Sequence, residues 1–233
     1  MGSKQTLITM RHGLRQDEID NGEWAFTAER PWDPPLSAEG RRQAAATAKA
    51  LATYRLDYIV VSPFLRCLQT VAEILAGLPE PKPAVEVDCS LGEVMSTAFL
   101  AGHGPPKGQA AQAWMWQGKA LTGVWKDQIG EGQVSYAEHD FANFPETYGD
   151  AHIRYTEALQ RAADRHAGKN LAVVTHGEAV GKSVTRLLPY VSVYQVDHCG
   201  YTVAQRQQGK EGEWDWQLQD SKGGTTGVHW SKR

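Results

Sequence analysis

The stretch LITMRHGLRQ, residues 7–16, reads as a buried strand that runs directly into charged side chains. Its apolar residues do not alternate with polar ones, which is typical of a strand covered on both faces. Arg11, His12 and Arg15 follow at once. In open parallel sheets, ligands bind just beyond the carboxyl ends of the strands. The end of this strand is therefore expected to carry functional residues.

Four short apolar runs of this kind predict central strands, at 6–10, 57–62, 84–88 and 170–175. Helical patterns lie between them and begin near residues 37, 64, 146 and 178. This alternation predicts an α/β fold, a three-layer sandwich with a mostly parallel central sheet and helices on both faces. Alternating residues at 201–219 predict a C-terminal antiparallel hairpin, and those from about 221 a loose tail.

Residues 96–145 interrupt the alternation of strands and helices and hold several glycines. We expect a single domain over residues 1–233, with this segment as an insertion over the active site. Trp114, Trp116 and Trp125 lie in it. Most of them are expected to anchor the insertion to the body of the domain, and one to lie at the rim of the pocket.

Composition excludes several classes of function. Lys and Arg number 24 against 27 Asp and Glu, which gives a net charge of −3 and no basic excess for nucleic-acid binding. Three cysteines without paired spacing predict neither a disulfide framework nor a zinc site. No apolar run is long enough for stable membrane insertion, and no signal peptide is recognisable. We expect a cytoplasmic protein, and the sequence leaves a homodimer open.

Other chemically active side chains follow the remaining strands. His176 comes directly after the strand at 170–175, and Glu93 follows the strand at 84–88 after a short loop. Arg66 lies near the start of the helix that follows Pro63. Because parallel strands end at one edge of the sheet, these side chains are expected to converge on His12 with the arginines of the first strand.

Three arginines at one site indicate a phosphate ligand. Guanidinium groups grip phosphate oxygens in pairs and stay protonated at any working pH, which suits Arg11, Arg15 and Arg66. A neutral imidazole can attack phosphorus in line and form a phosphohistidine, and His12 is the candidate nucleophile. No metal or cofactor is expected.

Two further residues complete the predicted chemistry. His176 is expected to bind the phosphate and to stabilise charge on its equatorial oxygens. Glu93 is the candidate acid and base, with a pKa raised by burial or by an anionic neighbour, so that it can protonate the leaving oxygen.

Three segments resemble the histidine phosphatase superfamily, whose fold is that of phosphoglycerate mutase. They are MRHG at 10–13, SPFLRCLQT at 62–70 and VVTHGEAV at 173–180. The first matches the family's Arg-His-Gly triplet, and the last its second-histidine segment. Their order along the chain also fits, over residues 6 to about 190.

Finer features resemble one phosphatase branch, that of the T-cell-signalling tyrosine phosphatases and the ecdysteroid-phosphate phosphatases. They are TMRHGLRQD at 9–17, PLSAEGRRQA at 35–44 and SLGEV at 90–94. In that branch the residue matching Arg15 lines the phosphate pocket. The chain departs from it at Val94, where an aromatic residue is typical, and it lacks the Glu-Ser and Asn that sugar-phosphate mutases carry after the triplet.

The resemblance implies a metal-independent phosphomonoester hydrolase whose substrate is a phosphorylated small molecule or of phosphotyrosine type. Two alternatives stay open: a phosphotransferase of mutase type, and a catalytically idle phosphate-binding module. Cys67 and Cys199 have no neighbours that would make them nucleophiles. Arg41 and Arg42 are interpreted as solvated helix charges.

Overall fold

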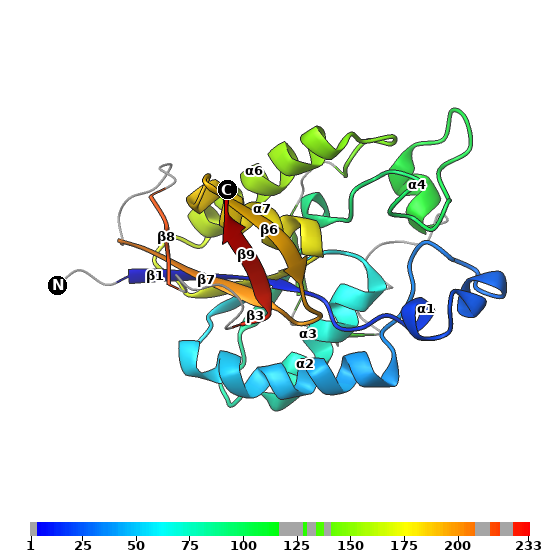
Figure 1. The fold of residues 1–233 in the computed structure, drawn as a ribbon. Coiled ribbons are helices and arrows are strands. Elements are labelled where there is room, and N and C mark those ends of the chain that lie inside the picture. The colour runs from blue at the N-terminus through cyan, green and yellow to red at the C-terminus, as the bar shows by residue number, and fades with distance from the viewer. Residues whose placement is uncertain (1–3, 117–127, 130–133, 138–140, 208–214, 220–225) are drawn as a thin grey trace.

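The computed structural model describes residues 4–116, 128–129, 134–137, 141–207, 215–219 and 226–233 (Figure 1). Its helices there are α1 (Gln16–Ile19), α2 (Ala38–Leu51), α3 (Leu65–Gly77), α4 (Ala111–Trp116), α6 (Tyr148–Arg165) and α7 (Gly177–Leu187). Its strands are β1 (Lys4–Arg11), β2 (Tyr58–Val61), β3 (Ala84–Asp88), β4 (Val134–Ala137), β5 (Leu171–Thr175), β6 (Val191–Val196), β7 (Tyr201–Gln207), β8 (Gln217–Leu218) and β9 (Val228–Lys232). Short 3-10 helices occupy Glu23–Phe26, Ala52–Tyr54 and Cys89–Leu91.

A central sheet runs through the domain in the order β4-β3-β2-β5-β1-β7-β8 within the described residues. The strands from β4 to β1 are mutually parallel, whereas β7 is antiparallel to β1 and β8 to β7. The predicted parallel core and the C-terminal hairpin are thus confirmed. The four predicted central strands correspond to β1, β2, β3 and β5.

Helices cover the sheet on both faces. Helices α2 and α3 lie on one face and α6 and α7 on the other (Figure 1). Neighbouring residues of β1 pack on opposite faces of the sheet. Ile8 packs in the core beneath α2 and α3, and Leu7 packs in the core beneath α6. Apolar side chains are buried between the sheet and the helices on each face, and this burial stabilises the sheet whose strand ends hold the predicted site residues.

Residues 228–232 form a strand, although the sequence predicts a loose tail from about residue 221. Strand β9 pairs antiparallel with β6, from Val191 opposite Lys232 to Val196 opposite Val228. This two-stranded ribbon packs on α7 through Val180 and Val184. The prediction of a loose tail is therefore wrong for residues 228–232, because they pair with a strand far away in the sequence and bury Val228 completely and Trp230 in part.

The segment 96–145 contributes a strand to the central sheet, which the sequence did not indicate. Strand β4 pairs parallel with β3 at the sheet edge. Trp114 is buried and stacks on Trp32, with ring centroids 4.2 Å apart, so it anchors the segment to the body as expected. Trp125 and the side chain of Trp116 lie outside the described residues. In the described part of the chain, no helix is both long and apolar enough to cross a membrane.

The backbone after β1 lies directly against α2. Ser37 caps this helix by accepting a hydrogen bond from the Gly40 amide. A Cβ at Gly13 would lie 2.5 Å from the Gly40 carbonyl oxygen, and a Cβ at Gly40 would overlap the Leu14 carbonyl. The two glycines therefore let the loop that follows His12 pass close to the helix.

Candidate active site

His12 and His176 lie side by side at the ends of neighbouring strands. In the register of β1 and β5, Arg11 is opposite Thr175, and the His12 amide donates to the Thr175 carbonyl over 3.0 Å. Both histidines are buried, and their ring centroids are 5.5 Å apart. The sheet therefore fixes the separation of the two imidazoles.

Arg66 lies at the centre of the site, in the first turn of α3, and its side chain is only 1% exposed. Its Nε donates to His12 Nε2 over 3.2 Å. Its Nη2 lies 3.2 Å from His176 Nδ1 and 3.3 Å from Glu93 Oε2. This predicted phosphate-binding guanidinium thus contacts all three side chains that the sequence predicts to be catalytic.

A buried carboxylate that sequence reasoning missed lies behind Arg66. Asp33 accepts a hydrogen bond from the Leu65 amide over 2.8 Å, and its Oδ1 is 3.7 Å from Arg66 Nη1. Arg30 forms an ion pair with the same carboxylate. Asp33 therefore ties the irregular segment before α2 to the start of α3 and holds the guanidinium from its far side.

The protonation state of His12 follows from its neighbours. Its Nδ1 lies 2.8 Å from the Gly13 carbonyl oxygen, which can only accept, so Nδ1 carries the proton. Nε2 then accepts from Arg66. Burial, reinforced by the positive charge of Arg66, holds the pKa of His12 well below its ordinary value. At neutral pH the imidazole is neutral, with its unprotonated Nε2 facing the arginine.

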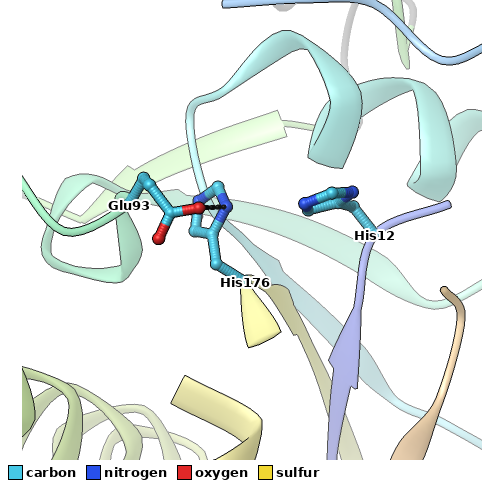
Figure 2. Close-up of side chains that lie close together, drawn as sticks. All are labelled: His12, Glu93 and His176. Carbon is cyan, nitrogen blue, oxygen red and sulfur yellow. Dashed lines mark ion pairs between the residues drawn. The ribbon is translucent and has the colours of Figure 1, made fainter. Parts of the chain in front are cut away.

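Glu93 and His176 form a buried pair, shown with His12 in Figure 2. Glu93 Oε2 lies 3.2 Å from His176 Nδ1. Burial lowers the pKa of His176 to about 4 despite the adjacent carboxylate. Burial alone would raise the pKa of Glu93, but the contacts with His176 and Arg66 outweigh it and hold the pKa below its usual range. The raised pKa that the sequence predicts for Glu93 is therefore not found, because His176 and Arg66 stabilise the carboxylate.

Arg154 of α6 holds the loop that carries Glu93. Its guanidinium donates to the carbonyl oxygens of Ser90, Gly92 and Glu93 over 2.6, 2.9 and 3.2 Å. It also donates to both carboxylate oxygens of Glu146 over 2.7 Å each. The sequence offered no signal for this residue, since it lies among the ordinary charges of a helix.

Arg11 and Arg15 lie at the open side of the site and face acidic residues of α1. Arg15 Nη2 is 2.9 Å from Asp17 Oδ2, and Arg15 Nε is 3.0 Å from Glu18 Oε1. Glu18 also lies 3.9 Å from Arg11 Nη2 and 3.1 Å from His198 Nε2. A carboxylate thus already contacts both guanidinium groups that the sequence assigns to phosphate.

A cavity of about 720 Å³ opens beside these groups. Arg11, His12, Arg15 and Glu93 line one end of it. All six predicted site residues therefore lie in one region: these four on the cavity wall, with Arg66 and His176 in contact with them.

His12, Glu93 and His176 place three ligand-type atoms within 4.8 Å of one another, a spacing that could also hold a metal ion. The guanidinium of Arg66 donates hydrogen bonds to the same nitrogen and oxygen atoms. A permanent positive charge at that place opposes a bound cation. The arrangement suits an anion better.

Cys67 and Cys199 are not activated thiols. Burial raises the pKa of Cys67 and of Cys199 to about 12, so both are protonated thiols at neutral pH. Arg41 and Arg42 pair with Glu73 and Glu39 on the exposed face of α2, as the sequence predicts.

Comparison with protein families assigns the chain to a known group. The model of the histidine phosphatase superfamily (branch 1) matches residues 7–219. The uncharacterized protein Rv0525 of Mycobacterium tuberculosis is 31% identical over 169 residues, which cover 72% of this chain and 73% of that protein.

Solved structures share the fold. Bacillus stearothermophilus YhfR superposes with a TM-score of 0.61 at 20% identity, over 93% of this chain and 96% of that one. The ecdysone phosphate phosphatase of Bombix mori, in complex with tungstate, gives 0.58 at 17%, over 93% and 92%. A phosphoglycerate mutase of Bacillus anthracis gives 0.59 at 16%, over 94% and 93%. Phosphatases and mutases thus both adopt this architecture.

Proposed function

The chain belongs to the histidine phosphatase superfamily, and from this premise we propose that it hydrolyses phosphomonoesters through a phosphohistidine on His12. One observation carries the proposal. The buried imidazole of His12 donates from Nδ1 to the Gly13 carbonyl oxygen, and its unprotonated Nε2 accepts a hydrogen bond from Arg66 Nε over 3.2 Å. A neutral nucleophile beside a permanent cation is the arrangement that attack on a phosphate dianion needs.

The substrate phosphate would bind where the cations converge. Arg66 and His176 would contact it from inside the site, and Arg11 and Arg15 from the cavity side. The guanidinium groups neutralise the equatorial oxygens and orient the ester bond in line with His12 Nε2. Catalysis by positioning and charge requires no metal. The hydrogen bonds from Arg66 to His12 and Glu93, two of the three possible metal ligands, support a metal-independent reaction.

In the first step, His12 Nε2 forms a bond to phosphorus while the bond from phosphorus to the ester oxygen breaks. The leaving oxygen takes a proton from Glu93. A bound dianion raises the pKa of Glu93, because it engages Arg66 and adds a negative charge close to the carboxylate. With substrate bound, Glu93 thus takes up from solvent the proton that it then donates to the leaving oxygen.

In the second step, water attacks the phosphohistidine. Glu93, now ionised, takes a proton from the attacking water, and the bond between phosphorus and Nε2 breaks. The products are inorganic phosphate and free His12. Alcohol and phosphate together account for every atom of the ester and the water, and the enzyme returns to its starting state.

The substrate class follows from the same features. We propose a phosphorylated small molecule or a phosphotyrosine-type side chain. The structural similarity to an ecdysone phosphate phosphatase is consistent with a phosphomonoester substrate.

The test is hydrolysis of p-nitrophenyl phosphate with chelator present, together with an assay for a phosphoenzyme that is stable in alkali and labile in acid. The variant His12→Ala should lose at least about 10³-fold in kcat and form no phosphoenzyme. His229→Asn is the matched control, since that histidine lies on β9 outside the lining of the cavity and should keep full activity.

Other outcomes separate the alternatives. Full activity in His12→Ala would refute the proposal. Phosphoenzyme that transfers its phosphate to a second alcohol faster than to water would identify a phosphotransferase of mutase type. Phosphate binding without phosphoenzyme or turnover would leave a binding module.

A further inference from the structure

The cavity continues well beyond the phosphate end as a groove between α7 and β6. Its floor on α7 is made by Gly177, Gly181 and Thr185, which recur every fourth residue and so lie on one face of the helix. Strand β6 forms the wall, since residues 192–196 line the same cavity. The ribbon of β6 and β9 lies against α7 in Figure 1.

Two independent lengths give the extent of the groove. The eight helical steps from Gly177 to Thr185 span about 12 Å. The four strand steps from Ser192 to Val196 span about 13 Å. At the near end, Arg11 Nη1 donates to the Val196 carbonyl over 2.6 Å, so this end of β6 adjoins the phosphate pocket. Ser192 and the neighbouring Arg233 therefore mark the far end.

A positive charge without an acidic partner faces this groove. Glu178 precedes Lys182 by one helical turn and would ordinarily pair with it. Instead, Glu178 accepts a hydrogen bond from the Tyr148 hydroxyl and lies 3.7 Å from His152 Nε2. No ion pair of Lys182 is found among the described residues.

Arg233 supplies a second cation at the far end. Its backbone amide donates to the Tyr190 carbonyl, and its Nε donates to Ser192 Oγ, over 2.9 Å each. These bonds fix the side chain at the cavity wall. His152 adds no charge at neutral pH, because burial and the nearby Lys182 lower its pKa.

We propose that this groove is a subsite for the leaving group, which carries a second anionic group bound by Lys182 and Arg233. The inference rests on the proposed phosphatase function and names its substrate class: an extended phosphomonoester with a carboxylate or second phosphate. Lys182 is six residues beyond His176, so the second anion lies about 9 Å along α7 from the site. Exposed aromatic side chains of Tyr148 and Tyr194 line the groove and suit an apolar body between the two anions.

The test uses phosphate monoesters of straight-chain ω-hydroxy acids of graded length, each compared with its methyl ester. Once the chain is long enough to reach Lys182 and Arg233, the substrate with a free carboxylate should have a kcat/KM about tenfold higher than its methyl ester. This preference should decrease at high salt. Short chains should show no preference.

Variants assign the preference to residues. Lys182→Gln and Arg233→Gln should each raise KM for the long acid about three- to tenfold, and neither should alter kcat or KM for p-nitrophenyl phosphate. Lys49→Gln is the matched control, because this exposed lysine lies on α2, on the opposite face of the sheet. It should leave all substrates unaffected.

Equal kcat/KM for acid and ester at every length would overturn the subsite. Loss of the preference in Lys49→Gln to the same degree would do so as well. If no phosphate ester at all is turned over, the phosphatase proposal fails separately. Calorimetric binding of the long acid and its ester to the unmodified protein then tests the subsite on its own.

Discussion

Replacement of Arg154 by methionine should destabilise the protein and misplace Glu93. The guanidinium makes three hydrogen bonds to carbonyl oxygens of the loop 90–93 and two to Glu146. Methionine keeps much of the length of the side chain but donates nothing. The Glu146 carboxylate, itself only 9% exposed, would remain buried without its cation.

The expected loss is about 3–5 kcal/mol in the free energy of unfolding, the range for removal of one partner from a buried ion pair. The measurement is urea unfolding at neutral pH. Arg161→Met is the matched control on the same helix, since its pair with Glu157 spans 3.5 Å and is solvent-exposed. That variant should change stability by less than about 1 kcal/mol. Equal effects of the two substitutions would refute the reasoning.

A second readout separates positioning from stability. Alkyl phosphates have a poor leaving group that needs a proton, whereas p-nitrophenolate leaves without one. At a temperature where the variant is folded, Arg154→Met should lower kcat for an alkyl phosphate far more than for p-nitrophenyl phosphate. Glu93→Gln should show the same dependence on the leaving group. A uniform loss on both substrates would contradict a role in placing Glu93.

Three further perturbations have expected outcomes of known sign. Gly40→Ala should destabilise by about 1–3 kcal/mol in chemical denaturation through overlap with the adjacent loop, although alanine favours helices. Gly149→Ala, whose Cβ would lie at an ordinary van der Waals distance of 3.8 Å from Thr147 Oγ1, should be neutral or stabilising. Between pH 6.5 and about 4, His176 binds a proton in the unfolded chain but not in the folded chain, because its folded pKa is lowered to about 4. The free energy of unfolding, measured across this pH range, should therefore fall as the pH falls, by about 3 kcal/mol at most. His176→Asn should reduce that slope. Glu18→Gln removes a carboxylate from Arg15 and should lower the inhibition constant of inorganic phosphate in a steady-state assay.

The sequence predicts the part of the site that parallel-strand geometry governs. His12 and His176 each follow a run of apolar residues, and adjacent parallel strands end together, so their proximity needs no knowledge of the loops. Arg66 is similarly constrained by the first turn of the helix after β2. These positions depend on local patterns and on one general rule of topology.

The remaining site residues depend on contacts between distant segments. Asp33 lies in an irregular stretch, and only folding brings its carboxylate behind Arg66. Arg154 looks like any helical charge until the loop 90–93 folds over it. Strands β6 and β9 are paired across about 35 residues of sequence, and β9 alone carries too few apolar residues to be recognised. Sequence patterns therefore predict least well the side chains that support a site and the residues that form the walls of its groove.

The electrostatics of the site explain why the predicted rise in the pKa of Glu93 is wrong and why Glu93 can still act as the proton donor. Burial raises the pKa of a carboxyl group only when no neighbour stabilises its charge, and both His176 and Arg66 lie within 3.3 Å of the Glu93 carboxylate. The same guanidinium donates a hydrogen bond to the unprotonated Nε2 of His12. A phosphate dianion that draws Arg66 toward itself would therefore free the nucleophile and weaken the stabilisation of the carboxylate in one event. Nucleophile and acid would both become competent only when substrate is bound, because one arginine holds both in the resting state.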